Sequence, residues 1–240
     1  MLGVRAGSLS EGNWLSRLPA PSLTQVVTVA GLLVLFVLLA FQVRQGATEY
    51  LDDSVQTQVR AVASRGMYRL GRTLSSLGRV EVELPALIVG AVLLARAGRP
   101  RVAAALVFLP LATIGVEIVF KQLLLVPTGE VSAILGAPLG ALPGRLLALL
   151  IAVPEAGFPS GHMARGTFLL GLLIGWVHLQ RSPLLRLAGT LGPLLLLSLM
   201  AFTRVLLNNE HTLAEVVGGM LLGLAALAAF PIIAHSRPSG

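Results

Sequence analysis

Residues 157–176 read GFPSGHMARGTFLLGLLIGW, so Ser160, His162 and Arg165 lie directly ahead of an apolar run. An apolar run of this kind is typical of a helix that crosses a lipid bilayer. Ionisable side chains at or inside such a helix are costly and usually have a function. The stretch therefore predicts a membrane protein with polar chemistry at the mouth of one span.

The composition of the whole chain favours the same class of protein. Of its 240 residues, 55% are hydrophobic and 12% are charged, with a mean hydropathy of +0.84. Soluble domains are about 25% charged, so we expect an all-α, membrane-embedded helix bundle. The chain has no cysteine, which excludes disulfides and thiolate metal sites. Its net charge of +7 comes without a basic block interleaved with aromatic residues, which argues against nucleic-acid binding.

Six apolar segments predict six transmembrane helices. They lie at 23–43, 83–96 with an extension one turn backward, 102–126, 161–179, 184–206 and 212–234. The first run is too long for a signal-peptide core and is expected to be a retained span. A shorter stretch at 139–153 is expected to be re-entrant or interfacial. The domain organisation is then a cytoplasmic tail at 1–22, a single transmembrane domain at 23–234 and a cytoplasmic tail at 235–240.

Between the first two spans, residues 48–79 have an amphipathic pattern. Apolar residues recur at helical spacing from Leu51 to Leu77, and four arginines supply a basic face. The pattern predicts one or two helices on the membrane surface, broken near Gly66 or Gly71. The alternative is a soluble hairpin packed against the bundle.

The short loops indicate the orientation in the membrane. Loops 96–101 and 180–186 are basic and lie on the same side as both termini in a six-span arrangement. By the positive-inside rule that side is cytoplasmic. Loops 127–160 and 207–211 then face outward, and we expect a bacterial inner (cell) membrane.

Charged and polar residues fall near the outward-facing ends of several spans. These are Glu117 with Lys121, Ser160 with His162 and Arg165, Arg204, and His211 with Glu215. Lys121 is the sole lysine among 18 basic residues. Cations and helix N-terminal N–H groups bind anions, two histidines can divide nucleophilic and acid roles, and an acid four residues after a histidine can orient its ring.

Pro159-Ser160-Gly161-His162, followed by Arg204, His211 and an acid at position 215, resembles the type 2 phosphatidic acid phosphatase superfamily, whose membrane lipid phosphatases are related to vanadium haloperoxidases. That superfamily has the motifs K-x6-R-P, P-S-G-H and S-R-x5-H-x3-D. The resemblance covers roughly residues 80–234 and implies six spans and an outward-facing site.

The resemblance implies a role for each matching residue. His211 would be the nucleophile that forms a phosphohistidine, His162 the general acid and Glu215 the group that orients His211. Lys121, Ser160, Gly161 and Arg204 would hold the phosphate oxygens. No metal and no cofactor is implied.

The chain departs from the family pattern at four positions. Thr128 and Gly129 stand where the first motif has arginine and proline, Thr203 replaces serine, and Glu215 replaces aspartate. One phosphate-binding cation is thus missing from its usual place. Arg165, Arg145 or an arginine of 60–79 is a candidate to replace it.

Several of these residues also have structural interpretations. Ser160 is well placed to cap a helix, and Glu117 is expected to pair with Lys121 or with another helix. Gly218, Gly219 and Gly223 are expected to allow close helix packing. His178 and His235 are expected to lie away from the site, and Glu155 and Glu210 in solvated loops.

The function predicted first is a metal-independent lipid phosphate or lipid pyrophosphate phosphatase. Polyprenyl pyrophosphate, phosphatidic acid, phosphatidylglycerol phosphate and phosphorylated glycolipids are its candidate substrates by resemblance. The alternatives are a lipid phosphotransferase that uses an alcohol acceptor and a catalytically degenerate lipid-binding scaffold. An intramembrane serine protease is disfavoured because it leaves Lys121 and Arg204 unexplained. Expected partners are the lipid phosphate, membrane lipids and, as an open alternative, a second copy of the chain.

Overall fold

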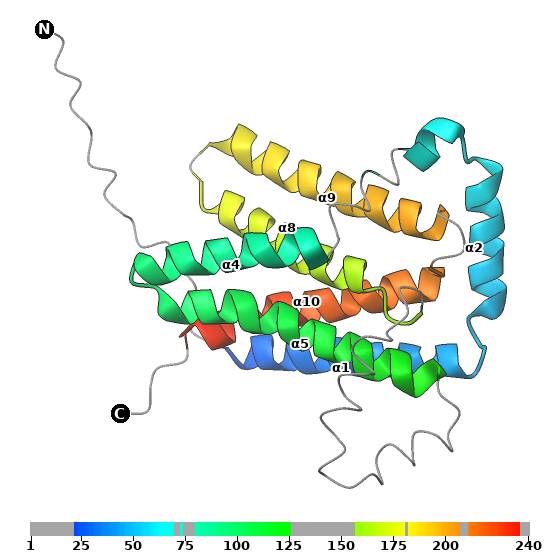
Figure 1. Ribbon diagram of the computed structural model, residues 1–240, viewed down its shortest axis with the longest axis horizontal. Coiled ribbons are helices and arrows are strands. Elements are labelled where there is room, and N and C mark those ends of the chain that lie inside the picture. Colours follow the sequence, from blue (N-terminus) through cyan, green and yellow to red (C-terminus); the bar gives the residue numbers. More distant parts are fainter. Residues whose placement is uncertain are drawn as a thin grey trace, which may run out of the picture.

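The computed structural model describes residues 22–69, 73, 80–125, 157–180, 182–206 and 211–235. This part of the chain is helical and contains no strand. The long elements are α1 (Leu23–Arg44), α2 (Glu49–Ala61), α4 (Val80–Arg96), α5 (Pro100–Leu125), α8 (Gly161–His178), α9 (Pro183–Leu206) and α10 (Leu213–His235). Six of them run along a common direction, and α2 stands across one end of the bundle (Figure 1).

All six predicted apolar segments are helices, and their bounds agree with the prediction to within a few residues. The second begins at Val80, which confirms its backward extension. Within the described residues, α1, α5, α9 and α10 are the four helices long and apolar enough to cross a membrane. Transmembrane roles for α4 and α8 stay a prediction.

The outward faces of α1 and α9 are apolar and exposed. Leu23, Val27 and Phe41 of α1 and Leu184 and Leu195 of α9 are each more than half exposed. A soluble monomer rarely leaves so much contiguous apolar surface uncovered. Lipid is the solvent that suits these faces.

Glycines of α10 let α8 pack closely against it, as predicted. A Cβ at Gly219 would collide with the Ser160 carbonyl oxygen, and a Cβ at Gly223 would collide with the Ala164 carbonyl oxygen. These two helices share the most extensive contact between elements in the described part of the chain. Small residues at membrane helix interfaces allow such backbone approach, which gains van der Waals contact.

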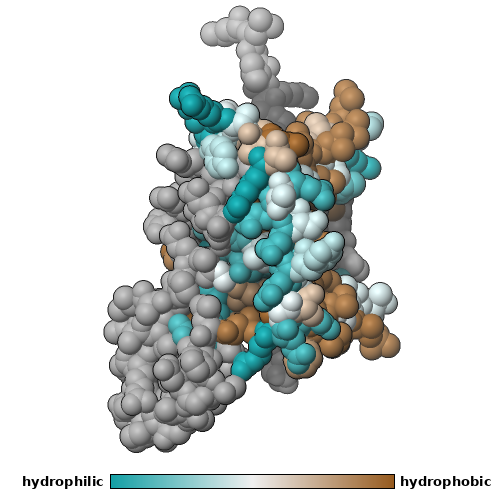
Figure 2. All heavy atoms as spheres, turned by 90° about the vertical axis from the view of Figure 1, so that its right-hand side faces the viewer, coloured by the Kyte–Doolittle hydropathy of each residue, from teal (hydrophilic) through white to brown (hydrophobic). Residues whose placement is uncertain are grey.

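Helix α2 packs against the bundle through one side. Asp52 is buried, while Val55 and Val59 contact an apolar cluster at the ends of α8, α9 and α10, formed by Met163, Met200, Val205 and Val216. Figure 2, which faces this end, shows a band of hydrophilic side chains with hydrophobic patches beside it. The amphipathic pattern thus turns an apolar stripe toward protein, while the position of α2 relative to a membrane surface stays a prediction.

The break after α2 lies close to Gly66, but the glycine itself is not part of it. The helix ends at Ala61, and a new helical turn covers residues 65–69, so Gly66 lies inside a helix. Ser64 explains where the new helical turn begins, because its Oγ accepts the Met67 N–H at 3.3 Å as an N-cap does. A capping serine, not a glycine, sets the break. Gly71, the stretch 139–153, Thr128, Glu155 and Glu210 lie outside the described residues.

Candidate active site

The start of α10 positions a histidine through a local cap. The Glu215 N–H donates to Thr212 Oγ1 at 3.3 Å, and the Thr212 N–H donates to Glu215 Oε2 at 3.2 Å. This reciprocal pair is a capping box, which a threonine three residues before a glutamate predicts. The same Oε2 atom lies 2.8 Å from His211 Nδ1.

His211 is therefore oriented as its spacing from Glu215 predicts. A carboxylate beside Nδ1 favours the tautomer with the proton on that nitrogen, since Nδ1–H can then donate to it. The other ring nitrogen, Nε2, keeps its lone pair. His211 is 2% exposed, so its ring is held in a largely dry environment.

A residue of α2 completes the cap of α10. Asp52 Oδ1 accepts the Ala214 N–H at 2.9 Å, although the two residues are 162 positions apart. Asp52 was not identified from the sequence. Asp52 lies three residues before Val55 and seven residues before Val59, so on a helix the three side chains share a face. An acid on this apolar face was the available signal for a buried contact.

At the start of α8, the backbone N–H of Ser160 is not available to hold a phosphate oxygen. Its N–H donates to the Glu215 carbonyl oxygen at 2.9 Å, so that donor is already used. The close approach of α8 and α10 at Gly219 explains this contact. Ser160 occupies the N-cap position of α8, yet its side chain makes no capping hydrogen bond.

The Ser160 hydroxyl is the polar group available for another purpose. Its Oγ is buried and has no hydrogen-bond partner among the described residues. A buried hydroxyl without a partner costs free energy, and such groups often mark a place where a ligand binds. The hydroxyl, not the N–H, is therefore the Ser160 group without a hydrogen-bond partner among the described residues.

Four charged side chains from α4, α5 and α8 form a buried ion network. Arg165 donates from Nε to Glu83 Oε2 at 2.9 Å and from Nη1 to Glu117 Oε2 at 3.0 Å. Lys121 Nζ lies 2.9 Å from Glu117 Oε1. Glu117 therefore pairs with both Lys121 and another helix, which were the two options predicted for it. The network holds two cations and two carboxylates, so its charges balance.

This network changes the interpretation of Arg165 and adds Glu83. Arg165 bridges two carboxylates, so a role as the replacement phosphate-binding cation would require it to leave or share them. Glu83 was not identified from the sequence, although an acid at the start of an apolar segment was a signal for a buried partner.

Glu117 also contacts the P-S-G-H segment. A Cβ built on Gly161 would collide with both carboxylate oxygens of Glu117. Glycine is therefore required at position 161 for Glu117 to reach Arg165 and Lys121 together. The carboxylate joins the lysine of the first motif to the backbone of the second.

The remaining predicted site residues lie at the same end of the bundle. His162 lies in the first turn of α8, next to the point where the Ser160 N–H meets the Glu215 carbonyl oxygen of α10. Arg204 is 4% exposed in the last turn of α9. Figure 1 shows the ends of α5 and α9 and the starts of α8 and α10 at the end of the bundle where α2 stands.

His178, expected to lie outside the site, is at the opposite end of α8. Its Nε2 lies 3.0 Å from Thr190 Oγ1 in an exposed position. It serves as a matched control for the two site histidines.

Residues 120–238 match the sequence profile of the PAP2 superfamily. The chain belongs to the PAP2 superfamily. The matched range contains the lysine, the P-S-G-H segment and the Arg204–Glu215 segment, so the profile covers every motif on which the resemblance rests. No curated protein matches the sequence.

A solved structure shares the fold of this PAP2 superfamily member. It is the crystal structure of the first transmembrane PAP2 type phosphatidylglycerolphosphate phosphatase from Bacillus subtilis, with a TM-score of 0.63 and 18% identity. The alignment covers 85% of this chain and 94% of that one. With the four apolar helices, the shared fold supports an integral membrane protein.

Proposed function

We propose that this PAP2 superfamily member is a lipid phosphate or lipid pyrophosphate phosphatase that works through a phosphohistidine at His211. The observation that carries the proposal is the 2.8 Å contact between His211 Nδ1 and Glu215 Oε2 at the end of the bundle where His162, Lys121 and Arg204 lie. Membership of the superfamily supports phosphatase chemistry on lipids at the level of the family.

In the first step, Nε2 of His211 attacks phosphorus and forms an N–P bond. The bond between phosphorus and the leaving oxygen breaks, and His162 donates a proton to that oxygen. Glu215 stabilises the positive charge that develops on the His211 ring, as the orienting carboxylate of a catalytic triad does.

In the second step, water attacks the phosphorus of the phosphohistidine. His162, now neutral, accepts a proton from that water, and the N–P bond breaks. Inorganic phosphate leaves and His211 returns to its starting form. Neither step requires a metal ion.

The phosphate oxygens are held by Lys121, Arg204, the Ser160 hydroxyl and the Gly161 N–H. Charged donors aimed at an anion in a dry site stabilise the charge of a transferring phosphoryl group. Arg165 acts through Glu117 in this arrangement. It positions Lys121 and does not contact the phosphate directly.

Transfer to an alcohol acceptor in place of water is a second candidate. It is favoured by the pairing of Lys121 and Arg165 with carboxylates, which leaves this site less cationic than one with free cations. The first step is shared, and only the group that attacks the phosphohistidine differs. Product analysis distinguishes the two candidates.

The central experiment measures phosphate release in detergent with EDTA present, from phosphatidic acid, phosphatidylglycerol phosphate, a polyprenyl pyrophosphate and a phosphorylated glycolipid. Wild type, His211→Ala, His162→Ala and the control His178→Ala are compared. We expect release by wild type and His178→Ala, with an acid-labile, alkali-stable phosphoprotein that His211→Ala lacks.

Two results would count against this function. Phosphate release by His211→Ala at the wild-type rate would exclude the phosphohistidine, and loss of all activity with EDTA would contradict the metal-independent mechanism. A phosphoprotein without phosphate release, discharged only by added alcohols, would favour the transferase.

The proposal includes six spans, cytoplasmic termini and an outward-facing site in a bacterial inner membrane. Because the chain has no cysteine, single cysteines can report each side. Tyr50 is 88% exposed on α2, at the active-site end of the bundle. A cysteine at this position (Tyr50→Cys) should react with a membrane-impermeant thiol reagent in spheroplasts, whose inner membrane is intact. Ala97→Cys, at the opposite end, should react only after permeabilisation, and the reverse pattern would invert the orientation.

A further inference from the structure

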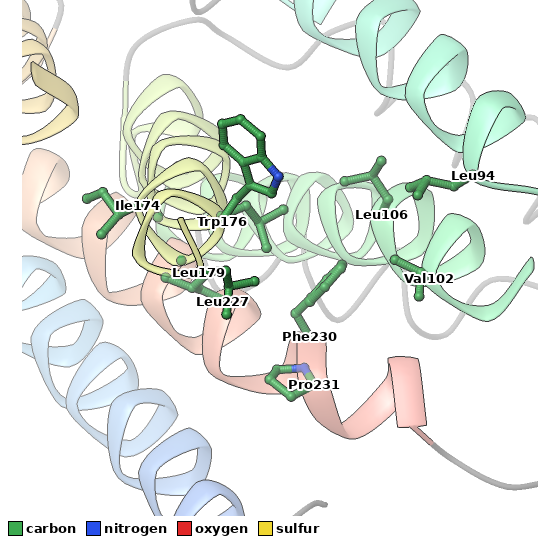
Figure 3. A pocket seen from close by; sticks show the side chains of 12 residues that line it. Leu94, Val102, Leu106, Ile174, Trp176, Leu179, Leu227, Phe230 and Pro231 are labelled. Carbon is green, nitrogen blue, oxygen red and sulfur yellow. The ribbon is translucent and has the colours of Figure 1, made fainter. Parts of the chain in front are cut away.

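An apolar cavity lies between α4, α5, α8 and α10. Its volume is about 490 Å³, within the range of small-molecule binding sites. The residues that line it are Leu94, Val102, Leu106, Gly171, Leu172, Ile174, Gly175, Trp176, Leu179, Leu227, Phe230 and Pro231. Figure 3 shows Leu94 of α4, Leu106 of α5, Trp176 of α8 and Phe230 of α10 around this space.

The cavity is separate from the candidate active site. On α8 the lining residue nearest His162 is Gly171, nine residues further along the helix, which corresponds to about 14 Å at a rise of 1.5 Å per residue. It also lies beyond Phe168, which is 1% exposed and packs in the core between the two regions.

The residues that line the cavity favour a hydrocarbon ligand. Apart from two glycines, every lining residue carries an aliphatic or aromatic side chain. Water would find few hydrogen-bond partners there. A lipid chain is already in an apolar phase, so what it gains by entering is van der Waals contact with preformed walls. Trp176 is 50% exposed, and such a residue is common where a protein meets lipid.

A basic turn adjoins the cavity. Leu94 and Val102, which line the cavity, flank the α4–α5 connection. Arg96, the last residue of α4, and Arg101, in the first turn of α5, are exposed. The sequence contains no acid between Glu83 and Glu117 to offset them. Basic clusters beside transmembrane helices attract the phosphates of anionic lipids.

The turn has a defined backbone. The Arg99 N–H donates to the Leu94 carbonyl oxygen at 2.9 Å and the Gly98 N–H to the Ala95 carbonyl oxygen at 3.1 Å. Gly98 has φ of +75°, as in a Schellman motif. This geometry fixes the course of the chain between Arg96 and Arg101.

We propose that this end of the bundle binds one anionic phospholipid, with a hydrocarbon chain in the cavity and its phosphate at Arg96 and Arg101. The site is distinct from the catalytic one and lies at the opposite end of α8. The chemistry that recognises the lipid is an apolar groove next to a pair of exposed guanidinium groups.

Gly175 allows a direct test of the cavity. A Cβ at this position meets no atom within 4 Å, and Gly175 lines the cavity, so Gly175→Leu is the substitution chosen to occupy it. Gly171 would be a poor choice, because a Cβ there collides with Leu227. Gly192→Leu on α9 is the matched control, since position 192 is equally open and does not line the cavity.

Detergent-purified protein is titrated with phosphatidylglycerol or phosphatidylcholine, and native mass spectrometry counts bound lipid while thermal unfolding reports stabilisation. Wild type and Gly192→Leu should retain one phosphatidylglycerol and gain Tm with it. Gly175→Leu should bind it about tenfold more weakly, because the chain loses its packing contacts. An Arg96→Gln/Arg101→Gln double variant should lose the preference for phosphatidylglycerol over phosphatidylcholine.

Equal phosphatidylglycerol binding by wild type and Gly175→Leu would overturn the proposal, as would an unchanged preference in the arginine double variant. A titration with glycerol phosphate in place of the lipid tests whether a headgroup without hydrocarbon chains is enough for binding. If glycerol phosphate raises Tm as much as the lipid does, the cavity is not part of the site. The double variant changes exposed residues, so it remains a test even if Gly175→Leu fails to fold.

Discussion

The two ends of the bundle share helices α5, α8 and α10 but differ in where they place their charged side chains. At the active-site end, α5, α8, α9 and α10 bring charged and polar side chains into a buried region. At the other end, α4, α5, α8 and α10 enclose an apolar cavity and keep their charges on exposed turns.

The difference shows how a membrane protein accommodates ionisable groups. A buried charge is tolerated when it is paired and hydrogen-bonded. Glu83, Arg165, Glu117 and Lys121 meet this condition with contacts of 2.9–3.0 Å. The Ser160 hydroxyl has no hydrogen-bond partner among the described residues, and this is why we propose that it binds the substrate phosphate.

The largest expected effect comes from removing the charge that orients His211. Glu215→Gln keeps the side-chain shape but not the charge, so kcat should fall about 10²–10⁴-fold, by analogy with the orienting carboxylate of a catalytic triad. Single-turnover formation of the phosphoprotein measures the step that is affected. Unfolding temperature should change little in comparison.

Glu215→Asp tests whether the position of the carboxylate matters as well as its charge. It restores the family's residue but shortens the arm, so the 2.8 Å contact with Nδ1 should be lost in part and activity should lie between wild type and Glu215→Gln. An equal loss in Glu215→Asp and Glu215→Gln would indicate that position, not charge, is what matters here.

The next largest effect concerns the stability of the active-site end. Arg165→Met leaves Glu83 and Glu117 buried without their shared cation, which should cost about 3–5 kcal/mol of unfolding free energy. Denaturant unfolding in mixed micelles measures the difference. Arg186 provides the control at the other end, because its Nε bonds the Gln180 carbonyl oxygen in an exposed position.

Arg186→Met should change stability little, so the contrast between the two arginines tests the comparison of the ends. A Glu83→Gln/Glu117→Gln/Arg165→Met triple variant should recover part of the stability lost in Arg165→Met. If Arg165→Met alone is as stable as wild type, the network is not an important contributor.

Much of this fold follows from local sequence signals. Apolar runs predict the six long helices, and the i,i+4 spacing predicts the contact between His211 and Glu215. The glycines of α10 predict close packing with α8. Each of these features depends on residues within one or two turns of a helix.

What could not be predicted depends on contacts between distant helices. The pairing of Glu83 with Arg165 joins residues 82 positions apart, and no local pattern indicates which acid an arginine will meet. The use of the Ser160 N–H by the Glu215 carbonyl oxygen likewise requires the separation of α8 and α10 to be known. Spacing identified residues that lie at the same end of the bundle but not which of their atoms take part in contacts with other helices.

Packing between α8 and α10 should show a smaller effect. Gly219→Ala adds a Cβ against the Ser160 carbonyl oxygen and Met163, and overpacking of this kind costs about 1–3 kcal/mol. Because the Ser160–Glu215 contact lies beside it, activity should also fall. Gly192→Ala is the control, since its Cβ meets no atom within 4 Å. Equal stability of the two variants would mean that α8 and α10 can separate without cost.

The smallest effect expected is at the long-range cap of α10. Asp52→Ala removes the acceptor of the Ala214 N–H and should cost about 1 kcal/mol, as the loss of a helix cap does. Asp52→Asn keeps an oxygen acceptor and should recover most of that loss, whereas Asp53→Ala, on the exposed side of α2, should have no effect on unfolding. Since Asp52 ties α2 to the helix that carries His211 and Glu215, hydrogen exchange at the start of α10 should rise in Asp52→Ala alone. Unchanged exchange there would show that α2 covers this end of the bundle without supporting the site.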